Sequence, residues 1–106
     1  MLRLKNEDRR GEDKMGEELL EETLKDRGDK YGRFIDHAMT TQWLKRVMQE
    51  QAKWPSLAED QKEALEMIAH KIGRILNGDP NYADSWHDIA GYAELVAKRL
   101  RTGETI

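Results

Sequence analysis

Residues 58–76 read AEDQKEALEMIAHKIGRIL, and this stretch decides the fold class. Its apolar side chains recur every three or four residues, so at about 100° per residue they share one face of a helix. They are Leu65, Ile68, Ile72, Ile75 and Leu76. Asn77-Gly78-Asp79-Pro80 follows as a strong turn signal. The pattern therefore predicts an amphipathic helix that starts near residue 56 or 58 and ends at residue 76.

Three further segments have the periodicity of helices. We expect a short helix over residues 17–27, a long one over residues 31–53 that ends before Pro55, and a last one over residues 83–101 that ends before Gly103. The apolar face of the helix over residues 31–53 comprises Phe34, Ala38, Thr41, Leu44, Val47 and Met48. The apolar face of the helix over residues 83–101 comprises Trp86, Ile89, Ala93, Val96, Ala97 and Leu100. Four helices joined by short loops predict an all-α fold with a four-helix bundle-like core.

The first part of the chain differs in composition from the rest. Residues 5–14, KNEDRRGEDK, contain no apolar side chain and cannot bury enough surface to offset the entropy of ordering. We therefore expect residues 1–15 to form a flexible charged arm, disordered or extended, before a single helical domain at residues 16–106. A total of 106 residues is one domain's worth of chain.

Composition excludes several classes of protein. Charged residues make up 37% of the chain, but acidic residues outnumber basic ones and the net charge is -3. This balance argues against a general nucleic-acid binder. Cysteine is absent, which excludes disulfides, thiolate metal sites and cysteine nucleophiles. No apolar run approaches the ~18 residues that a membrane span needs, and the first residues lack the apolar region of a signal peptide. We expect a cytoplasmic protein.

Two acids interrupt an apolar helix face. Asp88 lies within about 40° of Leu95 and Tyr92 on the last predicted helix, and Asp84 precedes it by one turn. Two carboxylates one turn apart repel each other unless a cation lies between them. That cation is either Mg²⁺, which prefers oxygen ligands, or a basic side chain of the preceding helix.

The basic side chains in question are Lys71 and Arg74. Lys71 lies at the border of the apolar face of its helix, where a lysine usually extends its ammonium group to solvent, and Arg74 lies opposite that face. Either residue is also a candidate ligand for a phosphate group. On the same helix, Glu63 and Glu66 form an E-x-x-E pair that points away from the apolar face. This pair is either a solvated surface or part of a pocket completed by a partner subunit.

Other side chains suggest packing or association rather than catalysis. His37 lies within the apolar arc of its helix, where a lone histidine is more often a hydrogen-bonded core residue than a ligand. Trp43, Trp54 and Met39 lie off that arc, and exposed aromatic patches commonly mark interfaces. We therefore expect self-association, as a homodimer or a higher homo-oligomer.

A resemblance adds to this interpretation. Lys71-Ile72-Gly73-Arg74 followed by Asp84-Ser85-Trp86-His87-Asp88-Ile89-Ala90-Gly91-Tyr92 resembles a family of small tailed-phage proteins with a K-x-x-R helix and a D-S-W-x-D-I-A-G-Y helix. Arg27-Gly28-Asp29-Lys30-Tyr31-Gly32 is similar to the upstream R-x-x-x-Y-G segment of that family. The resemblance covers roughly residues 17 to 100, and it implies a location in the host cytoplasm.

That family distantly resembles the MazG-type all-α nucleotide pyrophosphohydrolases. The resemblance implies Mg²⁺, an oligomer, and hydrolysis of a nucleoside triphosphate to its monophosphate and pyrophosphate. It implies that Asp84, Asp88, Glu63 and Glu66 bind the metal, and that Asp84, Asp88 and Glu66 serve catalysis. Lys71 and Arg74 would then bind the phosphates. The motif of that group is E-x-x-E followed by E-x-x-D, whereas this chain has Asp84-x-x-x-Asp88.

Two alternatives to a pyrophosphohydrolase are compatible with the same residues. The first is a non-catalytic module that binds a nucleotide or inhibits a host protein, in which Asp84 and Asp88 are paired structurally. The second is an adaptor whose N-terminal arm engages another chain.

Overall fold

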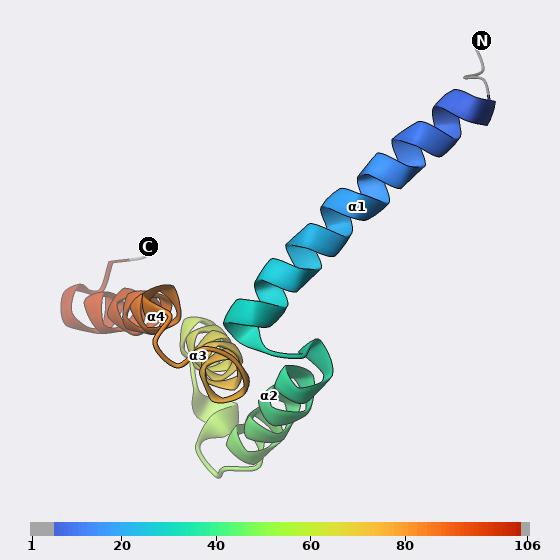
Figure 1. The fold of residues 1–106 in the computed structure, drawn as a ribbon. Coiled ribbons are helices and arrows are strands. Elements are labelled where there is room, and N and C mark those ends of the chain that lie inside the picture. Colours follow the sequence, from blue (N-terminus) through green and yellow to red (C-terminus); the bar gives the residue numbers. More distant parts are fainter. Residues whose placement is uncertain (1–5, 105–106) are drawn as a thin grey trace.

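The computed structural model describes residues 6–104, with side chains from residue 14 onward. This part of the chain is all-α, as the periodicity predicts, and it contains no strand. Four α-helices follow one another, α1 (Asn6–Tyr31), α2 (Phe34–Gln49), α3 (Glu59–Asn77) and α4 (Ala83–Thr102), and a short 3-10 helix, η1 (Trp54–Ser56), precedes α3 (Figure 1). None of the described helices is long and apolar enough to cross a membrane.

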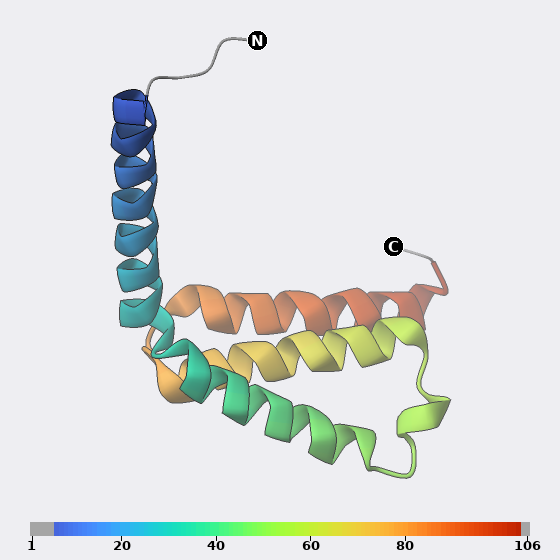
Figure 2. The same ribbon diagram turned by 90° about the vertical axis from the view of Figure 1, so that its right-hand side faces the viewer.

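Residues 6–15, which belong to the predicted N-terminal arm, are helical. The predicted helix over residues 17–27 continues back through residues 6–15 to form α1, and residues 1–5 lie outside the described residues. The helix continues past its predicted end at residue 27 and through Gly28. It ends before Gly32, whose φ of 78° is a left-handed conformation that glycine adopts without strain. At 1.5 Å per residue α1 is roughly 39 Å long. It projects from the other three helices (Figures 1 and 2).

The remaining boundaries follow local signals. α2 is shorter than the predicted span of residues 31–53, because Gly32 separates it from α1 and a turn precedes Pro55. The predicted spans of α3 and α4 are confirmed to within about three residues, which is the usual uncertainty of helix ends.

α3 lies between α2 and α4 in a single layer (Figure 2). Two ion pairs join α3 to α4, which runs antiparallel to it. Lys71 contacts Asp88 at 2.8 Å, and Arg99 donates two hydrogen bonds to the carboxylate of Asp60 near the opposite end. These pairs set the register of the two helices, so that residues near 60 on α3 are level with residues near 99 on α4.

The interface of α2 with α3 is polar and closely packed. A Cβ added at Gly73 would collide with the hydroxyl of Thr41 and lie 2.8 Å from Nδ1 of His37, so glycine permits this approach. His37 is buried, and its ring nitrogens lie 3.3 Å from Nδ1 of His70 and 3.4 Å from the hydroxyl of Thr41. The prediction that His37 is a hydrogen-bonded core residue is confirmed. Asn77 donates a further hydrogen bond of 3.1 Å to Thr40.

One chain buries little apolar surface. Among the described residues the only buried hydrophobic side chains are Ala64 and Ala69. The exposed large hydrophobic side chains are Met15, Leu19, Leu20, Leu24, Phe34, Ile35, Met39, Trp43, Val47, Leu65, Leu76, Trp86, Leu95 and Leu100. The radius of gyration is 19.7 Å, against roughly 13 Å for a compact chain of this length.

Several residues predicted to be buried are therefore exposed. They are Phe34, Val47, Leu65, Leu76, Trp86 and Leu100. The reason is the central position of α3, which presents Lys71 and Asp60 to α4 and Gly73 and Asn77 to α2. The apolar side of α3 is a third side, on which Leu65 and Leu76 stay exposed while the isoleucines are half-buried.

Candidate functional site

The end of α1 is held against the loop that joins α3 to α4. The backbone N–H of Asp79 donates a hydrogen bond of 2.7 Å to the carbonyl of Lys30. Gly32 packs so closely on the carbonyl of Asn77 that a Cβ would collide with it. A Cβ at Gly78 would likewise collide with the backbone of Lys30 and Tyr31. Glycines on both sides thus bring the ends of α1 and α3 together.

A tyrosine and an arginine stack at this contact. The guanidinium carbon of Arg74 lies 4.1 Å from the centre of the Tyr31 ring, within the range of a cation–π interaction. Arg27, one turn earlier on α1, lies 5.9 Å from the same ring. The two arginines come from different helices, and both meet Tyr31.

A second tyrosine continues the cluster toward α4. The rings of Tyr82 and Tyr31 meet edge-on, with 5.9 Å between their centres. The ammonium of Lys30 lies 5.2 Å from the centre of the Tyr82 ring. The Tyr82 hydroxyl donates a hydrogen bond of 3.0 Å to a carboxylate oxygen of Asp84, which raises the pKa of the Tyr82 phenol. Asp84 is thereby tied to the aromatic pair.

Lys71 provides the cation beside Asp88. Its ammonium lies 2.8 Å from the Asp88 carboxylate and is largely covered, since the lysine side chain is only 12% exposed. The hydrogen bond from Lys71 lowers the pKa of Asp88, so this carboxyl group stays ionised. The cation expected beside Asp88 was either Mg²⁺ or a basic side chain of the preceding helix. Within one chain, the basic side chain of Lys71 takes this position.

These residues form what we call the junction site. It comprises Arg27, Lys30, Tyr31, Lys71, Arg74, Tyr82, Asp84 and Asp88. The R-x-x-x-Y-G, K-x-x-R and D-S-W-x-D segments are distant in sequence, and all three meet here. The site therefore combines four basic groups, two aromatic rings and two carboxylates.

The glutamates of the E-x-x-E pair are not part of this cluster. Glu63 lines a cleft between α3 and α4 with Asp60, Tyr92 and Arg99, near the far end of the two helices. In the register of α3 and α4, Glu63 and Asp84 are about twelve residues apart, roughly 18 Å at 1.5 Å per residue. Glu66 is partly buried between these positions. Within the described part of one chain, no three carboxylates or histidines come close enough to hold a metal ion.

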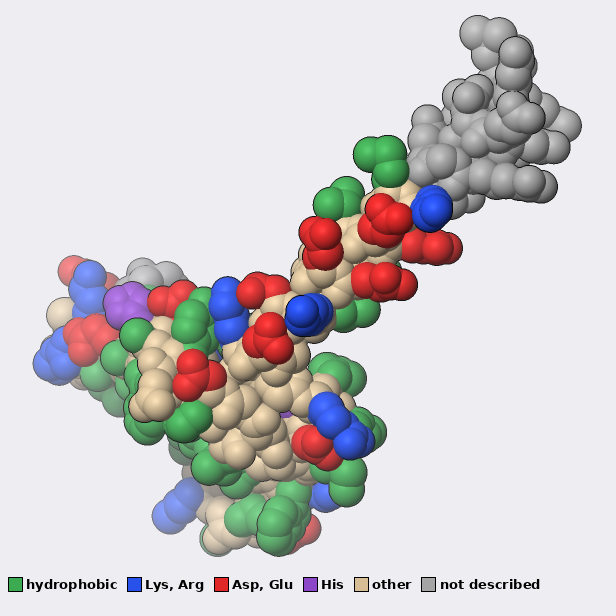
Figure 3. Space-filling model, viewed as in Figure 1, with side chains coloured by type: hydrophobic (Ala, Val, Ile, Leu, Met, Phe, Trp, Pro, Cys, Tyr) green, Lys and Arg blue, Asp and Glu red, His purple; other side chains and the backbone are tan. Residues whose placement is uncertain are grey.

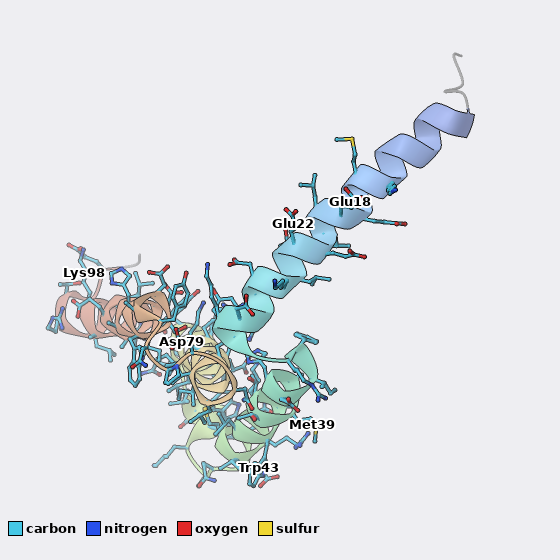
Figure 4. All side chains as sticks on the ribbon, in the orientation of Figure 1. Glu18, Glu22, Met39, Trp43, Asp79 and Lys98 are labelled. Atoms are coloured by element: carbon cyan, nitrogen blue, oxygen red, sulfur yellow. The ribbon has the colours of Figure 1, made fainter. Side chains whose placement is uncertain are left out.

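The side chains expected at an interface are partly exposed. Met39 and Trp43 are both 67% exposed, and Figure 4 shows them on α2, away from α1 and α4. Trp54 is half-buried in η1. Exposure alone does not reveal a partner, so the predicted homo-oligomer stays a prediction at this point.

Sequence reasoning missed four members of the junction site. Arg27, Lys30, Tyr31 and Tyr82 have no unusual position in any helical pattern, and Tyr82 lies in the loop before α4. One signal was available: Arg27 and Tyr31 are the ends of the R-x-x-x-Y-G segment. That segment could not be linked to Asp84 without the packing of α1 on the α3–α4 loop.

The fold and the site define a small all-α protein with a cationic and aromatic cluster at the meeting point of three helices. The chain belongs to the family described as "Domain of unknown function (DUF6378)", whose model matches residues 17–100. The match includes every residue of the junction site. No curated protein and no solved structure matches the chain.

Proposed function

We propose that the protein binds a nucleoside triphosphate at the junction site and hydrolyses it to the monophosphate and pyrophosphate. The observation that carries the proposal is the convergence of the three motif segments. Arg27, Lys30 and Arg74 surround two tyrosine rings, which suits a ligand that has both anionic phosphates and a flat base. The MazG-type resemblance of the same segments supports a pyrophosphohydrolase.

The resemblance implies Mg²⁺, and Asp84 and Asp88 are the two carboxylates of the junction site that would supply its oxygen ligands. Mg²⁺ is commonly held by one or two carboxylates together with phosphate oxygens of the substrate. Asp84 and Asp88 are one turn apart on α4 and would be its protein ligands. When bound, the ion would neutralise charge on the phosphate oxygens. Glu63 and Glu66 would join such a site only if a second chain brought them there, and their roles stay predictions.

Side chains of the junction site would then bind the phosphates and activate the water. Arg74 and Lys30 bind and orient the phosphates, and Tyr31 and Tyr82 keep these cations in place. A carboxylate of the site accepts the proton of the attacking water, and the bond between the α- and β-phosphates breaks to release pyrophosphate. Lys71 holds Asp88 in its ionised form.

Pyrophosphate release from a panel of nucleoside and deoxynucleoside triphosphates tests the proposal, with and without Mg²⁺. We expect release from at least one nucleotide only when Mg²⁺ is present. Arg74→Ala should weaken nucleotide binding, and Asp84→Asn should abolish release while leaving the helicity unchanged. Lys98→Ala is a matched control, since Lys98 is exposed toward the other end of α4 from the junction (Figure 4). A folded protein that neither binds nor cleaves any of these nucleotides would rule out the proposal.

A second candidate is a non-catalytic nucleotide-binding module. The Lys71–Asp88 ion pair favours it, because that pair already neutralises one of the two carboxylates. This candidate predicts nucleotide binding without pyrophosphate release. Under either candidate Asp88→Ala leaves the largely buried Lys71 without its partner and should destabilise the fold. The two candidates therefore differ in whether the unaltered protein releases pyrophosphate.

A further inference from the structure

The strongest apolar pattern of the sequence is left uncovered on the structure. Leu65, Ile72 and Leu76 lie on the side of α3 that faces neither α2 nor α4, and Leu65 and Leu76 are 39% and 68% exposed. Arg74, on the opposite side of α3, contacts α1 through Tyr31. The apolar side of the layer is therefore the side away from α1, and α1 does not cover it.

α4 extends the same surface. Trp86, Ala93 and Leu100 are spaced seven residues apart, so they share one face of α4, and all three are exposed. Asp88 and Arg99 point to α3, and the helical period places the Trp86–Leu100 face on the same side of the layer as the apolar side of α3. In Figure 3 hydrophobic side chains gather at the lower left of the molecule, away from α1.

We infer that this surface is the interface of a two-fold symmetric homodimer. We define the apolar face as Leu65, Ile72 and Leu76 of α3 with Trp86, Ala93 and Leu100 of α4. The two chains pack these faces against each other, so that two α3–α4 pairs form a four-helix arrangement. The junction sites remain on the outer sides of the dimer, and the inference does not depend on the proposed nucleotide chemistry.

The extent of the surface supports an interface. Leu65, Leu76, Trp86 and Leu100 keep between 39% and 68% of their surface exposed. Together with the neighbouring alanines and isoleucines they form one exposed apolar surface across α3 and α4, and such surfaces commonly mark interfaces. Among the described residues of one chain the only buried hydrophobic side chains are Ala64 and Ala69, so a partner on this face would add apolar burial that the single chain has little of.

The spacing of the α4 residues on this face suits a second copy of the chain. On α4 the two large side chains lie at equal distances on either side of Ala93. When two such helices run antiparallel with the two-fold axis at Ala93, Trp86 of each chain meets Leu100 of the other, and the small alanine lets the backbones approach. Such self-complementarity is what an isologous interface requires.

A single cysteine at the axis tests the arrangement directly, because the natural chain has none. Ala93→Cys should form a disulfide-linked dimer under mild oxidation, since equivalent residues meet at a two-fold axis. Ala52→Cys is the matched control, because Ala52 is exposed in the turn after α2 and lies off the apolar face. We expect several times more covalent dimer from Ala93→Cys. Equal or greater cross-linking of Ala52→Cys would overturn the arrangement.

Molar mass measured by light scattering tests the interface independently. The unaltered protein should have twice the mass of one chain, and Trp86→Glu and Leu76→Glu should shift the mass toward that of a single chain. Trp43→Glu serves as the control, since Trp43 is 67% exposed on α2 outside the apolar face. Trp86→Phe should keep the dimer, which separates loss of contact from loss of folding. A monomeric unaltered protein, or a dimer lost only with Trp43→Glu, would refute the inference.

Discussion

His70 carries a pH dependence that follows from where its ring lies. The ring meets that of His37 edge-on at 4.5 Å between α3 and α2. Burial is the main reason that the pKa of His70 falls from 6.5 to about 4, and the positive charge of Arg74 adds to the effect. The pKa of His37 is lowered for the same two reasons. Both histidines are thus neutral in the folded protein at neutral pH.

We predict that the folded protein loses stability as the pH falls from about 6.5 toward about 4. In that window the unfolded chain binds a proton at His70 and the folded chain does not, so the free energy of unfolding decreases. Asp60 and Asp88 have lowered pKa values, so their stabilising effect is lost only at still lower pH. Denaturant titrations at pH 7 and pH 5 measure the change.

His70→Gln should flatten this pH dependence, and His87→Gln should leave it unaltered, because His87 is exposed on α4. Equal stability of the unaltered protein at both pH values would contradict the prediction.

Gly73 and Gly91 form a natural pair for a second test at the residue scale. Both lie inside helices, but a Cβ at Gly73 would strike Thr41 and His37, whereas a Cβ at Gly91 meets nothing within 4 Å. We predict that Gly73→Ala destabilises the protein by about 1–3 kcal/mol through overpacking. Gly91→Ala should instead stabilise it by up to about 1 kcal/mol, as alanine favours helices. Thermal unfolding of the two variants measures both effects, and a similar sign for both would disprove the argument.

At the scale of elements, α1 differs from the other helices in how little supports it. The contacts of its side chains with the layer are made by its last turn, through Lys30 and Tyr31. Glu18 and Glu22 lie on the projecting part (Figure 4). Long helices in water normally owe their stability to packing of one face, whereas residues 14–29 of α1 are all exposed in one chain.

We predict that deletion of residues 1–15 changes the free energy of unfolding of α2, α3 and α4 by less than about 0.5 kcal/mol. Tyr31→Ala should have a larger effect, about 1–3 kcal/mol, because it removes the ring that Arg74 and Tyr82 contact. Denaturant unfolding followed by circular dichroism compares the two variants. Unfolding of the layer on deletion of residues 1–15 would show that the projecting part of α1 supports it.

At the scale of the whole molecule, one chain is an open layer rather than a closed bundle. A helix between two neighbours can bury two of its sides, and the third side of α3 remains exposed. The inferred dimer would bury that side, so folding and association should be linked. In such a protein the unfolding temperature depends on how much protein is present.

We predict that the unfolding temperature rises with protein concentration in the unaltered chain. Trp86→Glu should remove this dependence and lower the unfolding temperature at high concentration, because the partner no longer stabilises the folded form. Scanning calorimetry over a hundredfold range of concentration makes the measurement. An unfolding temperature independent of concentration would mean that the open layer is stable on its own.

The sequence alone determined the number and type of the helices and the approximate bounds of α3 and α4, because the spacing of apolar residues and the turn signals at Asn77-Gly78-Asp79-Pro80 and Gly103 act locally. It also predicted that His37 is buried and hydrogen-bonded, and it named Lys71 as one candidate partner of Asp88. Only the tertiary structure decided which neighbour each face meets. Periodicity states which residues share a face, but not what covers that face. The exposed side of α3 therefore depended on where its neighbours pack. The meeting of Arg27, Tyr31 and Tyr82 with Arg74 and Asp84 likewise depended on the packing of segments that are distant in the sequence.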